Sequence, residues 1–224
     1  MENDISLIAL LTISSLAPFL IAGGTCYIKF SIVFIMVRNA IGLQQIPSNM
    51  TLNGVAFLLA VFVMTPVFKD GFAYYKDNNL DLSKAEHIED FVDNGFGAYK
   101  SYLKKYSDPD LSAFFEKAQQ GRSRVIDADV TDEPVQTAEP SLFSLLPAYA
   151  LSEIKDAFRI GFYIYLPFVV IDLLISSVLL TLGMMMMSPV TISVPVKLLL
   201  FVVMDGWGLI STGLIEQYLS LGSQ

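Results

Sequence analysis

The fold of this chain is decided by residues 160–210, which read IGFYIYLPFVVIDLLISSVLLTLGMMMMSPVTISVPVKLLLFVVMDGWGLI. Two apolar segments, 160–182 and 190–210, flank a Gly-Met-Met-Met-Met-Ser-Pro turn at 183–189. At about 1.5 Å per helical residue, each segment is long enough to cross a hydrocarbon core of roughly 30 Å. The glycine, serine and proline of the turn favour an abrupt reversal of the chain. The stretch therefore predicts an antiparallel helical hairpin in a membrane.

Two charges of opposite sign lie inside this hairpin. Asp172 and Lys197 stand at comparable distances from the two ends of the turn, so folding about the turn brings them to a similar depth. A lone charge in a membrane interior costs ~2.5 to 3.5 kcal/mol on insertion scales, and such residues usually find a partner. We therefore predict an intramembrane charge pair. A structural pair that fixes helix register is favoured over a proton or ion relay, because only one acid and one base are involved.

The turn carries four consecutive methionines, Met184, Met185, Met186 and Met187. Successive helical positions point about 100° apart, so the four side chains cannot all face one core. The thioether is flexible and polarizable, and it can pack against changing surfaces. In a ring of subunits such turns would converge into a deformable apolar seal around a pore. The alternatives are a turn packed against its own neighbours and a Cu(I) site, the latter disfavoured by a single cysteine and a single histidine.

The composition is that of a membrane protein with a modest polar region. The 224 residues are 54% hydrophobic and 16% charged, with a mean hydropathy of +0.55. Uncharged runs between Asp4 and Lys29 and between Arg38 and Lys69 add two apolar segments to the hairpin. We predict an all-α membrane protein with four proline-kinked apolar segments in hairpins. Their prolines are Pro18, Pro66, Pro167 and Pro195.

The alternation of apolar and polar stretches predicts three consecutive regions. Residues 1–68 hold the N-terminal apolar helical segments, 5–28 and 39–68, joined by a short polar connection. Residues 69–140 form an acidic helical domain and a linker, and residues 141–224 hold an amphipathic helix and the hairpin with its methionine turn.

The central polar region has helix signals of its own. Ser83 and Glu86 form a capping box, and Asp108-Pro109 supplies an N-cap and a first-turn proline. Residues 127–140 are acidic and poor in large apolar side chains, which is typical of a flexible linker. The lone His87 is expected to be solvated. This region has too little apolar surface for an independent core, so we expect it to pack against copies of itself or the apolar helices.

Charges beside the apolar segments predict the orientation. Lys29 and Arg38 mark the first connection as cytoplasmic, whereas the segments are flanked on the other side by Lys69, Lys155 and Arg159. The first signal is favoured, because loops longer than about 60 residues cross a membrane largely regardless of charge. This places residues 69–140 outside the cytoplasm and the methionine turn toward the cytoplasm. The N-terminus lacks the basic region of a secretory signal, so we expect it to be retained.

The chain shows no sign of an enzyme or a nucleic-acid-binding protein. Its net charge of -8 disfavours nucleic acid as a partner. No zinc-protease, serine-hydrolase, Walker A or dinucleotide motif occurs in the sequence, and no cofactor is expected. Asp172 and Asp205 invite comparison with aspartyl proteases, whose two carboxylates share a proton. An acid paired with Lys197 would stay ionised, which argues against catalysis.

Two blocks of sequence resemble the FliP/SctR family of type III protein export. One block runs from LLPAYALSEIK at 145–155 through FVVID at 168–172 and GMMM at 183–186 to DGW at 205–207. The other runs from KFS at 29–31 through RN at 38–39 and Gly42 to QQ at 44–45 and Pro47. The stretch SNMTLNG at 48–54 looks more like the virulence-secretion (SpaP-like) branch than the flagellar branch.

The resemblance implies a non-enzymatic export-gate subunit of the bacterial inner membrane, with the polar domain on the periplasmic side. About five copies would join SctS-type and SctT-type subunits in a helical, pore-forming oligomer. The SctU and SctV export proteins would surround it, and unfolded secreted proteins would pass through. Met184 to Met187 would form the gasket of this pore. Asp172 and Lys197 match charged positions of the family.

Two other functions stay open at this point. An ion or proton transporter subunit would use Asp172 and Lys197, and it predicts pH-dependent flux by the purified protein alone. A structural scaffold without a pore-lining role would leave the methionines insensitive to mutation. The gate subunit predicts little activity alone and a tight membrane complex.

Overall fold

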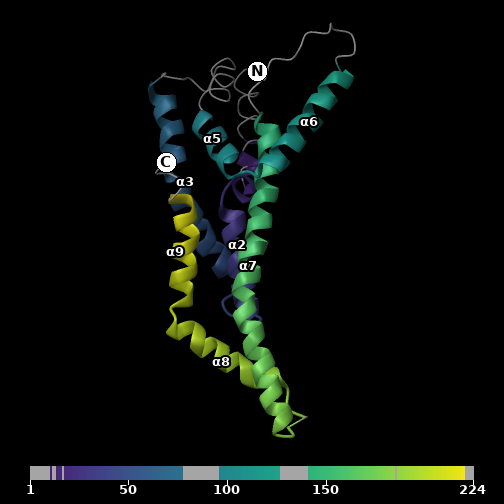
Figure 1. Ribbon diagram of the computed structural model, residues 1–224. Helices are drawn as coiled ribbons and strands as arrows, with labels where there is room; N and C mark the ends of the chain where they lie inside the picture. The colour runs from purple at the N-terminus through teal and green to yellow at the C-terminus, as the bar shows by residue number, and fades with distance from the viewer. Residues whose placement is uncertain are drawn as a thin grey trace. The chain divides into compact units, whose positions relative to one another are not determined.

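The computed structural model describes residues 11, 14–16, 18–77, 96–126, 141–184 and 186–219. All regular secondary structure in these ranges is helical (Figure 1), so the all-α prediction is confirmed for them. The helix expected after Ser83, the lone His87 and the linker at 127–140 lie outside the described residues.

The chain divides into two units, each assembled from separate stretches of sequence. The first combines Met1–Ile28 with Met64–Glu153, and the second combines Lys29–Val63 with Ile154–Gln224. The helices α3 (Asn49–Asp77) and α7 (Leu142–Thr181) each contribute to both units. The three consecutive regions expected from the sequence therefore do not coincide with these units.

In the first unit, α5 (Gly97–Tyr106) and α6 (Pro109–Ile126) pack on the beginning of α7. The expected start of α6 is present, since Asp108 Oδ1 accepts a 3.0 Å hydrogen bond from the backbone N–H of Asp110. The backbone N–H of Asp108 donates to Ser152 Oγ on α7 at 2.7 Å. This short polar contact fixes the point where α6 begins.

Lys29 and Arg38 do not mark a loop, contrary to the predicted polar connection. Both lie inside α2 (Tyr27–Ile41), with only 4% and 7% of their surface exposed. Lys29 Nζ is 3.8 Å from Asp156 Oδ2, and Arg38 donates to the carbonyl oxygen of Pro47 at 3.0 Å. The helix continues through both charged residues, although the buried Nε of Arg38 has no hydrogen-bond partner among the described residues. The turn follows at residues 42–48, and the next apolar helix starts at Asn49 instead of residue 39.

Two apolar helical stretches are broken beside glycines. The helix Pro18–Gly24 is bent by 73° from α2, and α8 (Pro189–Val203) is bent by 59° from α9 (Gly206–Leu219). The second arm of the hairpin, expected to be one helix over 190–210, is therefore interrupted at Met204 and Asp205. The helices continue without a break, by contrast, through three of the four prolines at which kinks were predicted. These are Pro66, Pro167 and Pro195.

Two helical stretches are long and apolar enough to cross a membrane by themselves, Asn49–Tyr74 and Leu142–Thr181. The number rises to four if each bent pair counts as one span. Length and composition thus give two to four spans within the described residues.

Candidate functional site

The methionine turn joins α7 to α8 through two local signals. Gly183 adopts a φ of +73°, the left-handed conformation that ends α7. The backbone N–H of Met184 bonds to Leu179 O at 3.0 Å and that of Gly183 to Leu180 O at 3.1 Å. These two bonds form a Schellman motif. Pro189 then occupies the first position of α8, where its fixed φ suits a helix start.

The methionines of the turn present their side chains outward. Met184 and Met187 are 39% and 41% exposed, and Met186 is fully exposed. Met185 lies outside the described residues. Because the protomer buries none of the three described thioethers, the apolar tip of the hairpin is available to another surface. Its role as a gate stays a prediction.

The structure brings Asp172 and Lys197 together. Lys197 Nζ on α8 lies 2.5 Å from Asp172 Oδ2 on α7, and it also donates a 3.3 Å hydrogen bond to the carbonyl oxygen of Ala40. Ala40 belongs to the last turn of α2, where carbonyl groups carry partial negative charge. The ammonium group therefore links three helices of the second unit.

The two partners of this pair differ in burial. Lys197 has 6% of its side chain exposed, whereas Asp172 has 42% exposed. Lys197 is thus enclosed by its two acceptors, while the outer side of the carboxylate remains open. Removing the two partners should have unequal consequences, because Lys197 is enclosed by the protein whereas Asp172 lies at the surface of the protomer.

A close helix approach sets the position of Lys197. Gly42, directly after α2, has a φ of +93°, and a Cβ added there would lie 2.6 Å from Val194 Cγ2. Val194 precedes Lys197 by three residues, so both lie on the same side of α8. Gly42 therefore lets α8 approach the end of α2, which brings the ammonium within reach of the carbonyl oxygen of Ala40.

Asp205 occupies a different setting from Asp172. It has a φ of +50°, which is uncommon for a residue with a side chain, and it lies in the break between α8 and α9. A Cβ added at Gly208 would be 2.3 Å from Asp205 Oδ2, so the carboxylate covers the first turn of α9. The positive end of the helix dipole favours a negative charge at this place. Within the part of the chain that the structure describes, no cluster of three or more His, Cys, Asp or Glu could hold a metal ion.

The first unit holds a cluster of tyrosines that was not predicted from the sequence. The hydroxyl groups of Tyr102 and Tyr149 are 2.7 Å apart, and Tyr99 donates to the carbonyl oxygen of Gly24 at 2.8 Å. Burial raises the pKa of Tyr99 to about 12. Burial also raises the pKa of Tyr102 far above its usual range, and the bond to Tyr149 offsets this in part. The signal available was the helical spacing of the tyrosines in α5.

Comparison with known proteins gives matches over nearly the whole chain. The model of the FliP family matches residues 10–214. The chain is 59% identical over 224 residues to the surface presentation of antigens protein SpaP of Salmonella typhimurium, covering 100% of both chains. It is 58% identical over 221 residues to the protein of that name from Shigella flexneri, covering 99% of each. It is 43% identical over 225 residues to Yop proteins translocation protein R of Yersinia pestis, covering 97% of this chain and 98% of the relative.

Proposed function

Because this chain belongs to the FliP family of type III secretion export apparatus proteins, we propose that it is a pore-forming export-gate subunit of such a system. Relatives named for the presentation of antigens and the translocation of Yop proteins support a role in protein secretion. The cargo would be unfolded secreted proteins, and the chain itself would carry out no catalysis. The apolar helices and the family support a location in the bacterial inner membrane.

The observation that carries the gate proposal is the tip of the α7–α8 hairpin. Its three described methionines present exposed thioethers on a turn that a Schellman motif and a helix-starting proline define. Several copies arranged about an axis would bring these tips together, and a narrow apolar constriction excludes water and ions. Because methionine repacks readily, such a seal could part around a polypeptide and close again.

We propose that Lys197 and Asp172 serve as a clamp for this tip. The pair ties α8 to α7, and the bond to the carbonyl oxygen of Ala40 ties α8 to α2. Lys197 is eight residues beyond Pro189, or about 12 Å along α8. Anchored at that distance, the turn keeps a fixed base while its side chains remain adaptable.

The partners proposed are those of a shared export gate. About five copies of this chain would assemble with small SctS-type and SctT-type subunits. SctU and SctV export proteins would surround them. The polar segment at 69–140 is proposed to lie on the periplasmic side.

An ion or proton transporter is the second candidate, favoured by one observation. The carboxylate of Asp172 has 42% of its side chain exposed, so protons could reach it while Lys197 stays buried. That function requires pH-dependent flux through the purified chain alone. The gate requires a discrete multi-subunit assembly and little flux by the chain alone.

The experiment that tests the gate measures ion leak through the assembled complex. The chain is coexpressed with its neighbouring export genes, extracted, checked by native mass spectrometry and reconstituted in liposomes. Replacing Met185 and Met186 with Ala should raise ion leak at least about tenfold, because it opens an apolar constriction. Met204→Ala is the matched control, since Met204 is 56% exposed but lies at the α8–α9 break. Unchanged leak in an intact complex would refute the seal, and a stable monomer would favour the transporter.

A further inference from the structure

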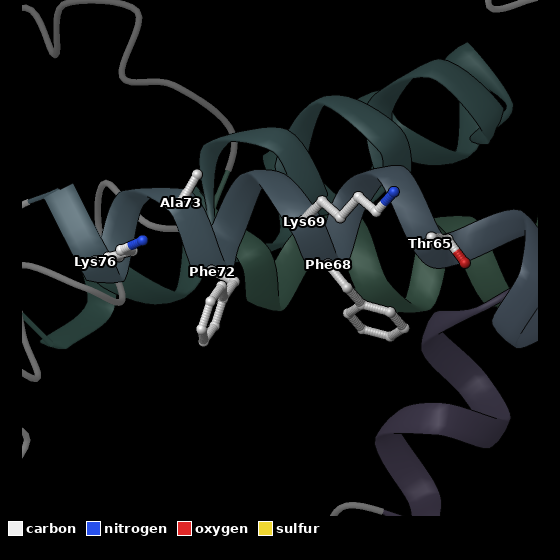
Figure 2. A pocket seen from close by; sticks show the side chains of 6 residues that line it. All are labelled: Thr65, Phe68, Lys69, Phe72, Ala73 and Lys76. Carbon is white, nitrogen blue, oxygen red and sulfur yellow. The ribbon is translucent and has the colours of Figure 1, made fainter.

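One face at the end of α3 carries two exposed lysines beside two exposed aromatic rings. In the first unit, this face borders a shallow groove of about 550 Å³ (Figure 2). Spacings of three, four and seven residues place its members on one side of the helix. The lining residues are Thr65, Phe68, Lys69, Phe72, Ala73 and Lys76.

The two rings form the apolar part of this face. Phe68 and Phe72 are 56% and 68% exposed, and Figure 2 shows both projecting from the same side of α3. Residues four apart on a helix lie one above the other, so the rings form an apolar strip along the helix. This strip matches an extended hydrocarbon chain better than a polar ligand.

The two lysines form the polar part. Lys69 and Lys76 are both exposed and lie seven residues apart, or about 10 Å along the helix axis. Asp70 points about 100° away from Lys69 around the helix, so it does not stand between the lysines. Together they attract an anion.

The position of the groove indicates the source of that anion. The apolar stretch Asn49–Tyr74 is long enough to cross a membrane, and only 28% of its most apolar window is buried within the protein. Lys69 and Lys76 lie on either side of the point where this stretch ends. Lysines at such ends extend their ammonium groups toward lipid phosphates, and aromatic side chains collect at the same depth.

We propose that this face of α3 binds an anionic phospholipid. Its phosphate lies between the ammonium groups of Lys69 and Lys76, and one acyl chain packs against Phe68 and Phe72. The lipid anchors the end of α3 at the boundary of the bilayer. The site is separate from the hairpin and does not depend on the gate proposal.

The test compares the amount of lipid that the complex retains when it contains the unchanged full-length protein and when it contains a variant. The complex is reconstituted in nanodiscs of phosphatidylglycerol and phosphatidylcholine, and the lipids that remain bound are counted by native mass spectrometry. The double variant Lys69→Gln/Lys76→Gln should retain at least about fivefold less phosphatidylglycerol, because each lysine contributes to attraction by an anionic surface. Retention of phosphatidylcholine should not change.

The control variant removes the same charge elsewhere. Lys104 on α5 and Lys117 on α6 are exposed, so Lys104→Gln/Lys117→Gln has the same net charge as the test variant. This control should retain phosphatidylglycerol like the unchanged protein. An equal loss of phosphatidylglycerol in the test and control variants would refute a specific site, because the change in net charge would then explain the effect.

Two further measurements separate other occupants from a lipid. Phe68→Ala/Phe72→Ala keeps both lysines and should still lower retention, because the acyl chain loses its contacts; unchanged retention would overturn the assignment to a lipid. Inorganic phosphate should fail to displace the lipid, and full displacement would assign the site to a soluble anion. Amine labelling supplies the last check. Protection of Lys69 and Lys76 in a complex held in phosphatidylcholine alone would show that a protein subunit covers this face and would refute the proposal.

Discussion

The hydroxyl group of Tyr99 donates a 2.8 Å hydrogen bond to the carbonyl oxygen of Gly24, at the break that precedes α2. Thr25 satisfies the backbone on either side: its Oγ1 donates to Ile21 O at 2.7 Å and accepts from Tyr27 N at 3.3 Å. Side chains thus replace the helical bonds that the break removes. A tyrosine of the central polar region thereby stabilises a corner in the first apolar segment.

Gly24 should be the more sensitive of two neighbouring glycines. A Cβ at Gly24 would lie 2.2 Å from Tyr99 Oη and 3.2 Å from Leu146 Cδ2, whereas a Cβ at Gly23 would meet nothing within 4 Å. We expect Gly24→Ala to destabilise the protein by about 1 to 3 kcal/mol, as overpacking does. Thermal unfolding of the extracted protein measures this. Gly23→Ala is the control, and equal melting temperatures for the two variants would contradict the close packing.

Tyr99 should make stability fall at alkaline pH. Its pKa is raised to about 12 by burial, whereas an unfolded tyrosine titrates near 10. The unfolded state therefore loses its proton first, and the contribution of Tyr99 is present below pH about 10 and declines as pH rises toward about 12. Chemical denaturation at several pH values measures the decline. The variant Tyr99→Phe, which does not titrate, should show a smaller decline, and an unchanged slope would contradict the assignment.

The charge pair should respond unequally to removal of its two partners. Asp172→Asn leaves the buried Lys197 without a counter-charge, whereas Lys197→Met leaves an unpaired carboxylate at the surface of the protomer. We expect Asp172→Asn to cost more, toward about 3 kcal/mol, because an enclosed charge has lost its counter-charge. The double variant should cost less than the sum of the singles by at least about 1 kcal/mol. Denaturant titration of the four proteins gives the coupling, and strict additivity would rule out direct pairing.

The corner between α8 and α9 should depend on one glycine of α9. A Cβ at Gly206 would lie 2.3 Å from the ring of Phe201, which itself packs edge-on against Trp207 at 5.3 Å. We expect Gly206→Ala to displace that ring and to destabilise the protein by about 1 to 3 kcal/mol. Trp207 fluorescence reports the displacement. Gly213→Ala, in open space on the same helix, should be neutral or stabilising by about 0.5 to 1 kcal/mol, because alanine favours a helix over glycine.

The local features of the hairpin could be predicted from the sequence. Gly183 and Pro189 act on their own backbone neighbours, so their types were enough to locate the end of α7 and the start of α8. The proximity of Asp172 and Lys197 followed from the same turn and from the cost of an unpaired charge in an apolar setting. The helical class followed from hydropathy and composition alone.

The features that depend on distant partners could not be predicted. Lys29 and Arg38 resembled residues of a loop, because a hydropathy profile registers a charge but not its partner in space. The partners here are Asp156 for Lys29 and the carbonyl oxygen of Pro47 for Arg38. The two breaks lie beside glycines and not at the prolines inside the helices. A proline removes a single backbone hydrogen-bond donor, and neighbouring groups can replace the lost bond. The bond between Tyr99 and Gly24 spans 75 residues of sequence and leaves no local signature.

The bend between α8 and α9 has a consequence for how the chain crosses a membrane. α8 has 15 residues and is about 22 Å long, which is short of a hydrocarbon core of roughly 30 Å. The insertion machinery meets α8 and α9 as one apolar stretch, whereas the folded protein holds them 59° apart. α8 and α9 would therefore have to cross the core together, with the bend at Asp205 inside the span.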